Sequence, residues 1–210
     1  MLEELNKAKI VNVYKKGQTI FYEGNKPYGV YCMNKGKVKL TKHAPEGKEL
    51  LVKISKEGDL LGYRSFFTSE LYTSTAEVLE DSTICFLDRE IFFNLLKKQP
   101  EFSLKLLAMM GHDIKCAEEK SRDLAYKSSQ ERIIELLLTL HETYGIKQDN
   151  GTYKIDILLS RDDLASMIGT TTETVVRLIT WLREKELITV KQKYTYIIDL
   201  DGLQKMIPEY

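Results

Sequence analysis

The spacing of apolar and polar residues divides the chain into a first part made of short strands and a second part made mainly of helices. From about residue 11 to residue 90, runs rich in Val, Ile, Tyr, Phe and Thr are separated by Gly or Pro. Strands that recur every 8–12 residues or so indicate a sandwich, a barrel or a jelly roll. The predicted strands are Thr19–Tyr22, Gly29–Asn34, Lys37–His43, Glu49–Ile54, Thr73–Leu79 and Ser82–Asp88.

Helical spacing dominates from residue 88 onward. Pro100 is expected to separate two helices, because proline cannot continue a preceding helix, and Ser128 or Ser129 offers an N-cap for a third. The predicted elements are a short helix at Asp88–Lys98, a long helix from about Glu101 to Tyr126, a helix at Gln130–Tyr144, a turn-rich segment at Gly145–Gly151, a strand at Thr152–Leu158 and a final turn or helix at Gly202–Ile207.

Two short amphipathic helices joined by a tight turn are predicted within Leu159–Leu187. Ser160 stands three residues before Asp163, which is the spacing of a helix N-cap and its reciprocal partner. The apolar positions Leu164, Ala165 and Ile168 then share one helix face. Gly169 follows and can reverse the chain at small steric cost.

The second of these helices has two distinct faces. Thr170 with Glu173 repeats the capping spacing, and the helix is expected to end at about Glu186. Val175, Leu178, Ile179 and Leu182 fall on one face at helical spacing. Glu173, Val176, Arg177 and Thr180 fall on the opposite face. This is the pattern of a helix-turn-helix with an exposed second helix.

The exposed face suits the major groove of DNA. Arg177 can donate two hydrogen bonds to guanine, and Glu173 can accept one from cytosine and orient the guanidinium group. The alternative is that Glu173 and Arg177 form only a surface ion pair at i, i+4. A wing favours DNA: two strands, Ile188–Val190 and Tyr194–Ile198, are predicted on either side of Lys191-Gln192-Lys193, and such lysines can contact phosphates beside the groove.

The segment SRDDLASMIGTTTETVVRLITWLREKELI resembles the helix-turn-helix of the Crp/Fnr family of bacterial transcription regulators. The resemblance extends along nearly the whole chain and implies an α+β protein that acts as a homodimer on double-stranded operator DNA, with RNA polymerase as a further partner. It implies that Glu173 and Arg177 contact bases and that Val176 lies where subfamilies differ. Residues expected to contact the DNA backbone or to support the reading helix are Ser160, Arg161, Thr170, Thr171, Thr172, Thr180, Lys191 and Lys193.

The long helix carries a moderate coiled-coil pattern, and the resemblance implies that it is the dimer axis. Its predicted seam consists of Leu107, Met110, Ile114, Ala117, Ser121 and Leu124. A helix that packs only on its own domain is the alternative. The predicted domains are a cyclic-nucleotide-binding-like β-roll at 1–99, a dimerisation helix at 100–127 and a winged helix at 128–210.

The glycine spacing of the first part resembles the β-roll of cyclic-nucleotide-binding domains, although a β-core without a ligand is also compatible with it. The resemblance places an effector pocket at Gly62, Tyr63, Arg64, Ser65, Tyr72 and Thr73. Members that bind cyclic AMP have a glutamate where Tyr63 stands and an Arg-Ser pair where Tyr72-Thr73 stands. A buried phosphate without a cation is unfavourable, so we predict no response to cyclic AMP. Arg64 could bind another anion, or could pair with Glu70 or Glu77.

Composition adds few constraints. Lysine plus arginine and aspartate plus glutamate both number 31, so any basic surface must be local. No apolar stretch is long enough for a membrane span, and the N-terminus has no signal-peptide pattern. The three cysteines are far apart in the sequence, which favours a reducing cytoplasm. The scattered histidines and the lack of a catalytic constellation predict no metal, no cofactor and no enzyme activity. The alternative function is a ligand-binding β-barrel protein whose winged helix mediates protein interaction.

Overall fold

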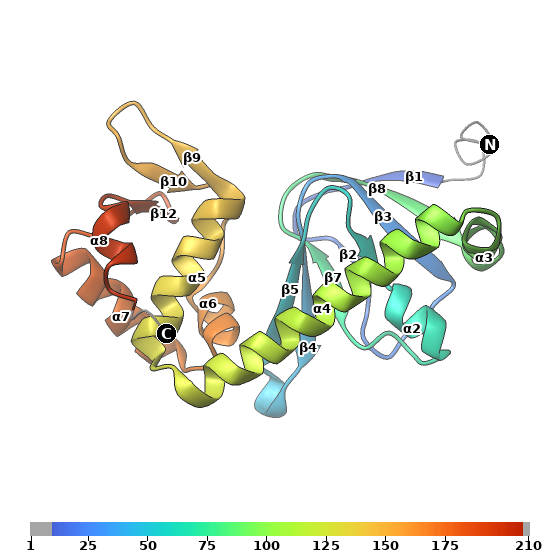
Figure 1. Cartoon of the computed structure of the whole chain (residues 1–210), viewed down its shortest axis with the longest axis horizontal. Coiled ribbons are helices and arrows are strands. Elements are labelled where there is room, and N and C mark those ends of the chain that lie inside the picture. The colour runs from blue at the N-terminus through green and yellow to red at the C-terminus, as the bar shows by residue number, and fades with distance from the viewer. Residues whose placement is uncertain (1–9, 208–210) are drawn as a thin grey trace. The chain divides into compact units, whose positions relative to one another are not determined.

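The computed structural model describes residues 10–207, except for the side chain of Glu46. The chain divides into two compact units after Ile114, and Figure 1 shows the elements of each. The long helix α4 (Pro100–Tyr126) contributes to both units. The division into three domains with borders at 99 and 127 stays a prediction, and the predicted outer limits, residues 1 and 210, lie outside the described residues.

The first unit is built on strands that follow the predicted pattern closely. Two of the observed strands, β1 and the short β6, were not among the predicted strands. The strands are β1 (Ile10–Tyr14), β2 (Thr19–Phe21), β3 (Gly29–Lys35), β4 (Val38–His43), β5 (Glu49–Ser55), β6 (Leu60–Leu61), β7 (Thr75–Val78) and β8 (Ser82–Asp88), and a 3-10 turn, η1 (Pro45–Gly47), precedes β5.

These strands form two four-stranded antiparallel sheets, in the orders β1-β8-β3-β6 and β2-β7-β4-β5. Their inner faces share one apolar core, to which β3 contributes Met33 and β4 contributes Leu40. Aromatic side chains thicken this core, since the rings of Phe21 and Tyr72 are stacked with centroids 4.0 Å apart. The prediction of a jelly-roll-like β-structure is confirmed.

Helices cover the other face of the first sheet. Val30 on β3 packs with Phe66 of α2 (Tyr63–Thr68), Phe92 of α3 (Arg89–Lys98) and Leu106 of α4. Val30 and Met33 lie an odd number of residues apart on one strand, so they point to opposite faces, and this sheet is buried on both sides.

The sequence did not predict the helix α2, which contains three of the residues expected in the effector pocket, Tyr63, Arg64 and Ser65. Gly62 has a φ of 78° and precedes the helix, which allows the chain to change direction there. The six-residue helix places Tyr63 and Phe66 one turn apart against the core. A pattern this short carries too few apolar repeats to distinguish a helix from a turn.

The second unit combines three helices with a small sheet. The helices are α5 (Ser129–Tyr144), α6 (Arg161–Ile168) and α7 (Thr172–Glu184), and α8 (Leu200–Gln204) follows them. The antiparallel sheet has the order β11-β12-β10-β9, with β9 (Gly145–Lys147), β10 (Tyr153–Ile155), β11 (Ile188–Lys191) and β12 (Tyr194–Ile197). The winged helix-turn-helix is thereby confirmed.

Several predicted bounds in this unit were wrong. The turn-rich segment after α5 begins with the strand β9, which pairs with β10. The strand expected at Thr152–Leu158 is only three residues long, and the closing helix begins at Leu200 rather than Gly202. Sheet pairing and capping decide these limits, since Asp199 accepts a hydrogen bond from the backbone N–H of Gly202 at 2.8 Å and so begins α8 earlier.

Candidate DNA-reading surface and ligand pocket

The turn between α6 and α7 is held by local chemistry at both ends of α6. The Ser160 hydroxyl accepts a hydrogen bond from the backbone N–H of Asp163 at 3.0 Å, and the Asp163 carboxylate accepts one from the backbone N–H of Ser160 at 2.9 Å. This confirms the predicted capping box. Gly169 ends the helix with a φ of 63°, and a Cβ there would lie 2.4 Å from Cδ2 of Leu124.

The start of α7 lies one residue later than predicted. The N-cap is Thr171, whose hydroxyl accepts a hydrogen bond from the backbone N–H of Thr174 at 3.3 Å. The backbone N–H of Thr170 instead donates to the carbonyl of Ala165 at 3.0 Å and so completes the end of α6. The shift leaves Glu173 in the first turn of α7, where a carboxylate is favoured by the helix dipole.

The two faces of α7 are as predicted. Val175, Leu178, Ile179 and Leu182 are buried. The opposite residues, Glu173, Val176, Arg177 and Thr180, are exposed and are called the reading face below. Nη2 of Arg177 donates to the Thr174 hydroxyl at 3.3 Å, and the Thr180 hydroxyl donates to the carbonyl of Val176 at 2.9 Å. An exposed arginine near the helix start can therefore contact bases directly.

Sequence reasoning missed the side chain that supports this turn most strongly. Arg132 of α5 donates from Nε to the carbonyl of Ile168 at 2.7 Å and from Nη2 to the carbonyl of Gly169 at 3.5 Å. Nη1 of the same guanidinium donates to the carbonyl of Lys127. These carbonyls end two helices, so Arg132 satisfies acceptors that the helices themselves leave open. Its partners on α6 are 36 and 37 residues away, and no local pattern marks such a contact.

The remaining predicted supports lie around the reading face. The Thr172 hydroxyl donates to the Asp162 carboxylate of α6 at 2.5 Å and so joins the two helices. Arg161 is half-buried, and burial together with the charge of Arg183 lowers the pKa of its guanidinium. Arg161 therefore lies deeper than a surface contact to phosphate would require.

The wing has the predicted hairpin form. β11 and β12 pair antiparallel from Ile188 to Lys191, and the turn residues Gln192 and Lys193 have φ values of 51° and 71°. Two successive residues at positive φ are characteristic of the tightest hairpin turns. The side chains of Lys191 and Lys193 are exposed, as contact with phosphate requires.

The predicted seam along α4 is largely exposed. The exposed fractions of Leu107 and Ile114 are 61% and 59%, and that of Leu124 is 44%. Ala117 and Ser121 are exposed as well. Met110 differs, because it packs against the apolar cluster of its own unit. Leu104, which was not predicted, is 65% exposed and lies one turn before Leu107.

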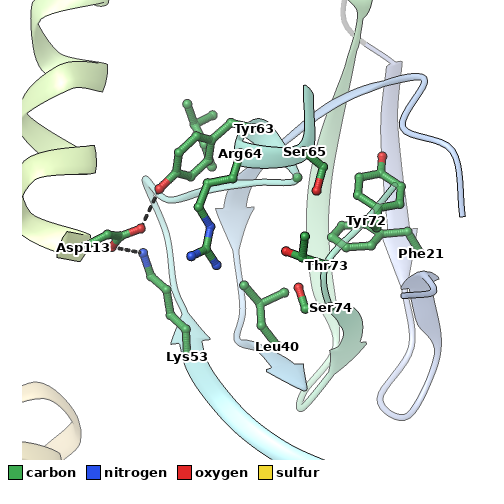
Figure 2. Close-up of a pocket in the computed structure, with 12 residues that line it drawn as sticks. Phe21, Leu40, Lys53, Tyr63, Arg64, Ser65, Tyr72, Thr73, Ser74 and Asp113 are labelled. Atoms are coloured by element: carbon green, nitrogen blue, oxygen red, sulfur yellow. Dashed lines mark hydrogen bonds and ion pairs between the residues drawn. The ribbon is translucent and has the colours of Figure 1, made fainter. Parts of the chain in front are cut away.

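All six residues predicted for the effector pocket come together in the first unit. A hollow of about 360 Å³, part of it open to solvent, lies beside α2 (Figure 2). It is lined by Gly62, Tyr63, Arg64, Ser65, Tyr72 and Thr73 and by Phe21, Leu40, Lys53, Leu60, Ser74 and Asp113. The last six were not predicted, because they come from β2, β4, β5, β6, the segment before β7 and α4.

One carboxylate of this hollow joins three elements. Asp113 of α4 accepts a hydrogen bond from the Tyr63 hydroxyl of α2 at 2.5 Å and pairs with Nζ of Lys53 of β5 at 2.7 Å (Figure 2). Burial acts to raise the pKa of Asp113, but the hydrogen bonds of Lys53 and Tyr63 and the charges of Lys53 and Arg64 outweigh it. The pKa of Asp113 is therefore lowered, and this carboxylate is ionised at neutral pH.

Arg64 is exposed and lines this hollow. It forms no ion pair with Glu70 or Glu77, which was the alternative prediction. Glu77 instead pairs with Lys39 at 3.3 Å, and Glu70 accepts a hydrogen bond from the Thr68 hydroxyl at 3.0 Å. The guanidinium group of Arg64 is thus available to a ligand.

Both tyrosines of the pocket are buried and occupy structural roles. Tyr63 is 3% exposed and Tyr72 is 5% exposed. Burial raises the pKa of both phenols well above the ordinary value, and for Tyr63 the hydrogen bond to Asp113 adds to the effect. Both hydroxyls therefore stay protonated. Gly62 is required beside Tyr72, since a Cβ there would lie 2.8 Å from Cε1 of that ring.

Within residues 10–207, no group of three or more His, Cys, Asp or Glu side chains is placed to hold a metal ion. In the same range, no helix is long and apolar enough to cross a membrane.

Comparison with known proteins assigns both units. Residues 11–99 match the family of the cyclic nucleotide-binding domain, and residues 131–206 match the Crp-like helix-turn-helix domain. The global nitrogen regulator of Nostoc sp. is 30% identical over 186 residues, which cover 88% of this chain and 83% of that protein. The chain belongs to the Crp/Fnr family. It is therefore a Crp/Fnr-type transcription regulator with a helix-turn-helix DNA-binding domain, and the members of this family are not enzymes.

Other Crp/Fnr proteins resemble the chain over most of its length. The fumarate and nitrate reduction regulatory protein of Vibrio cholerae is 27% identical over 192 residues, which cover 91% of this chain and 76% of that protein. The structure of FixK2 from Bradyrhizobium japonicum has a TM-score of 0.80 and 21% identity, covering 96% of this chain and 98% of that one. At that identity the structural likeness shows the fold.

Proposed function

We propose that this regulator binds a pseudo-palindromic operator as a homodimer and uses the reading face of α7 to recognise a G·C pair. The observation that carries the proposal is the exposure of Arg177 and Glu173 on one face of a helix whose other face is buried. Arg177 would donate to O6 and N7 of guanine, and Glu173 would accept from N4 of cytosine. Val176, exposed between them, would contact a neighbouring base. RNA polymerase is the further partner through which such a regulator acts.

The other residues of the site would fix how the protein lies on DNA. Lys191 and Lys193 of the wing would contact phosphates, which adds affinity without sequence preference. Ser160, Thr170, Thr171, Thr172 and Thr180 would contact the DNA backbone or support the turn. Arg161, which is half-buried, would support the turn.

A dimer seam on α4 supports recognition of a palindrome. The stripe of Leu107, Ile114 and Leu124 is exposed at a spacing close to the heptad. A two-fold dimer presents its recognition helices to half-sites about 34–36 Å apart, which is one turn of DNA. Exposed apolar side chains on a long helix are unfavourable in a monomer, and a second copy of the same helix would cover them.

We also propose that neither cyclic AMP nor cyclic GMP is the effector. Where the cyclic-nucleotide pattern has a glutamate and an arginine, this chain has the buried Tyr63 and Tyr72. Calorimetry should detect no binding of either nucleotide at micromolar concentration, and micromolar binding would contradict this part of the proposal.

Selection of operator DNA from random duplexes, followed by gel-shift titration, tests the reading role. Arg177→Ala should cost about 1–3 kcal/mol on the selected site and should leave the weak binding to random DNA nearly unchanged. Lys205→Ala is the control, because it removes one positive charge from an exposed position at the end of α8, outside the helix-turn-helix. Equal losses on selected and random DNA would show that Arg177 contacts only phosphate. No DNA binding by the wild type would favour a protein-interaction role for the winged helix.

A further inference from the structure

The hollow beside α2 has an excess of positive charge. Among its lining residues, Lys53 and Arg64 are cationic and Asp113 is the single carboxylate. Lys53 is paired with Asp113, with side-chain exposures of 27% and 18%. Arg64 has no such partner among the lining residues drawn in Figure 2. The pocket therefore offers one cation to a ligand directly, while the second cation is held by Asp113.

Hydroxyl groups surround the same space. Ser65 is 3% exposed and Ser74 is 6% exposed, and both line the hollow together with Thr73. Within the described part of the chain, these three side chains make no hydrogen bond to protein atoms. The hydroxyls of these lining residues are not sealed from solvent, so they can donate to or accept from a polar ligand that enters the hollow. Figure 2 shows the three oxygens around the space that the Arg64 guanidinium enters.

We propose that a small organic anion binds at Arg64 and pairs with Lys53 in place of Asp113. The Asp113 carboxylate thus competes with the bound anion for Lys53. The anionic group is a carboxylate or a phosphate, since both accept hydrogen bonds from a guanidinium, an ammonium and several hydroxyls. Leu40 lies beside this group of polar side chains, so the remainder of the ligand packs against an apolar wall. The inference rests on the proposed function and deepens it, because it names an effector class for the pocket that we propose cyclic nucleotides do not fill.

The exchange of Lys53 also alters how α4 is held. Asp113 bonds to β5 through Lys53 and to α2 through Tyr63, so each bond ties α4 to the β-roll. An anion that recruits Lys53 removes the first of these ties and leaves the second. The helix α4 is continuous from Pro100 to Tyr126. The contact of Asp113 with Lys53 therefore lies on a helix whose later part belongs to the second unit.

Isothermal titration of the full chain with inorganic phosphate and with benzoate tests the site, and benzamide serves as the neutral counterpart of benzoate. Asp113→Asn should bind at least one of the two anions at least about tenfold more tightly than the wild type, because a unit charge within about 4 Å acts strongly in a partly buried site. Glu101→Gln removes one negative charge from the exposed first turn of α4 and should leave the affinity unchanged. Benzamide should not bind.

Two further variants locate the effect. Lys53→Gln combined with Asp113→Asn should return the affinity to the wild-type level, because the gain depends on the released Lys53. Arg64→Ala should abolish anion binding. The proposal is overturned if neither anion binds Asp113→Asn at millimolar concentration, if Glu101→Gln and Asp113→Asn change the affinity equally, or if Arg64→Ala still binds.

Separate measurements distinguish a loss of anion binding from misfolding and from a failure of the proposed DNA recognition. Circular dichroism checks that each variant is folded, and Asp113→Asn keeps the size of the side chain. The titrations contain no DNA, so their failure would leave operator recognition by Arg177 untouched. Conversely, failure of the gel-shift test would leave the anion titrations valid.

Discussion

Replacing Gly169 with alanine tests how the helix-turn-helix is joined to α4. Gly169 has a φ of 63°, and an L-residue in this left-handed region costs about 1–2 kcal/mol. The new Cβ would also lie 2.4 Å from Cδ2 of Leu124, which must move. Leu124 is 44% exposed and has room to rotate, so we assign this movement the cost of a distorted rotamer, about 0.5–1.5 kcal/mol. The sum predicts a loss of about 1.5–3.5 kcal/mol in the free energy of unfolding.

Urea unfolding followed by tryptophan fluorescence reports on the second unit, which contains Gly169, because Trp181 of α7 is the only tryptophan in the sequence. With a denaturant slope of about 2 kcal/mol per M, the midpoint should fall by roughly 0.7–1.8 M. Gly151→Ala is the control, since Gly151 has a φ of 82° but a Cβ at that position would meet no atom within 4 Å. It should show only the backbone cost.

A double-mutant cycle isolates the contact itself. In a Leu124→Ala background, Gly169→Ala should cost no more than Gly151→Ala does, so the cycle should give a coupling of about 0.5–1.5 kcal/mol. Zero coupling between positions 124 and 169 would refute the argument that Leu124 occupies this space. A Gly169→Ala variant as stable as Gly151→Ala would refute it independently.

Three further predictions concern assembly, DNA and pH. Ile114→Asp should convert the dimer to monomers in sedimentation and remove most operator affinity, whereas Ala108→Asp, at an exposed position outside the predicted seam, should not; an unchanged Ile114→Asp dimer would contradict the seam. Lys191→Ala and Lys193→Ala should each weaken binding to all DNA sequences alike and reduce the salt slope by about one unit, and sequence-dependent losses would contradict a phosphate contact. The folded pKa of Asp113 is lowered, so its stabilisation is present above the unfolded pKa of about 3.9 and is lost as pH falls through the folded value. The difference in unfolding free energy between wild type and Asp113→Asn should therefore be constant above about pH 5 and should shrink in acid. A difference that does not depend on pH would contradict the ionised pair.

Local signals explain why much of the DNA-binding unit was predictable. Ser160 and Asp163 cap α6 through contacts three residues apart, so a sequence window shows both partners. The start of α7 was harder, because Thr170, Thr171 and Thr172 are adjacent and each could be an N-cap. The structure chooses Thr171 because the backbone of Thr170 is engaged by the end of α6. That choice depends on the geometry of the preceding helix end.

Contacts between distant segments explain what the sequence did not reveal. Arg132 supports the helix-turn-helix through carbonyls 36 and 37 residues away, and any exposed arginine of a helix would look the same in sequence. Asp113 meets Tyr63 and Lys53 across 50 and 60 residues. On α4 it was one charged position among many. The predicted pocket residues near Gly62 were found because a family resemblance marks them, and their partners on other elements were not.

One residue, Tyr63, enters both the proposed loss of a cyclic-nucleotide contact and the observed contact that holds α4. A carboxylate at position 63 could accept hydrogen bonds from a ligand hydroxyl, but beside Asp113 it would bring two negative charges together. A tyrosine there does the opposite, since its hydroxyl donates to Asp113 and stays protonated. Asp113 in turn neutralises Lys53, which would otherwise be a second unpaired cation in the hollow. Tyr63 and Asp113 are therefore matched to each other, because one donates the hydrogen bond that the other accepts in its ionised form.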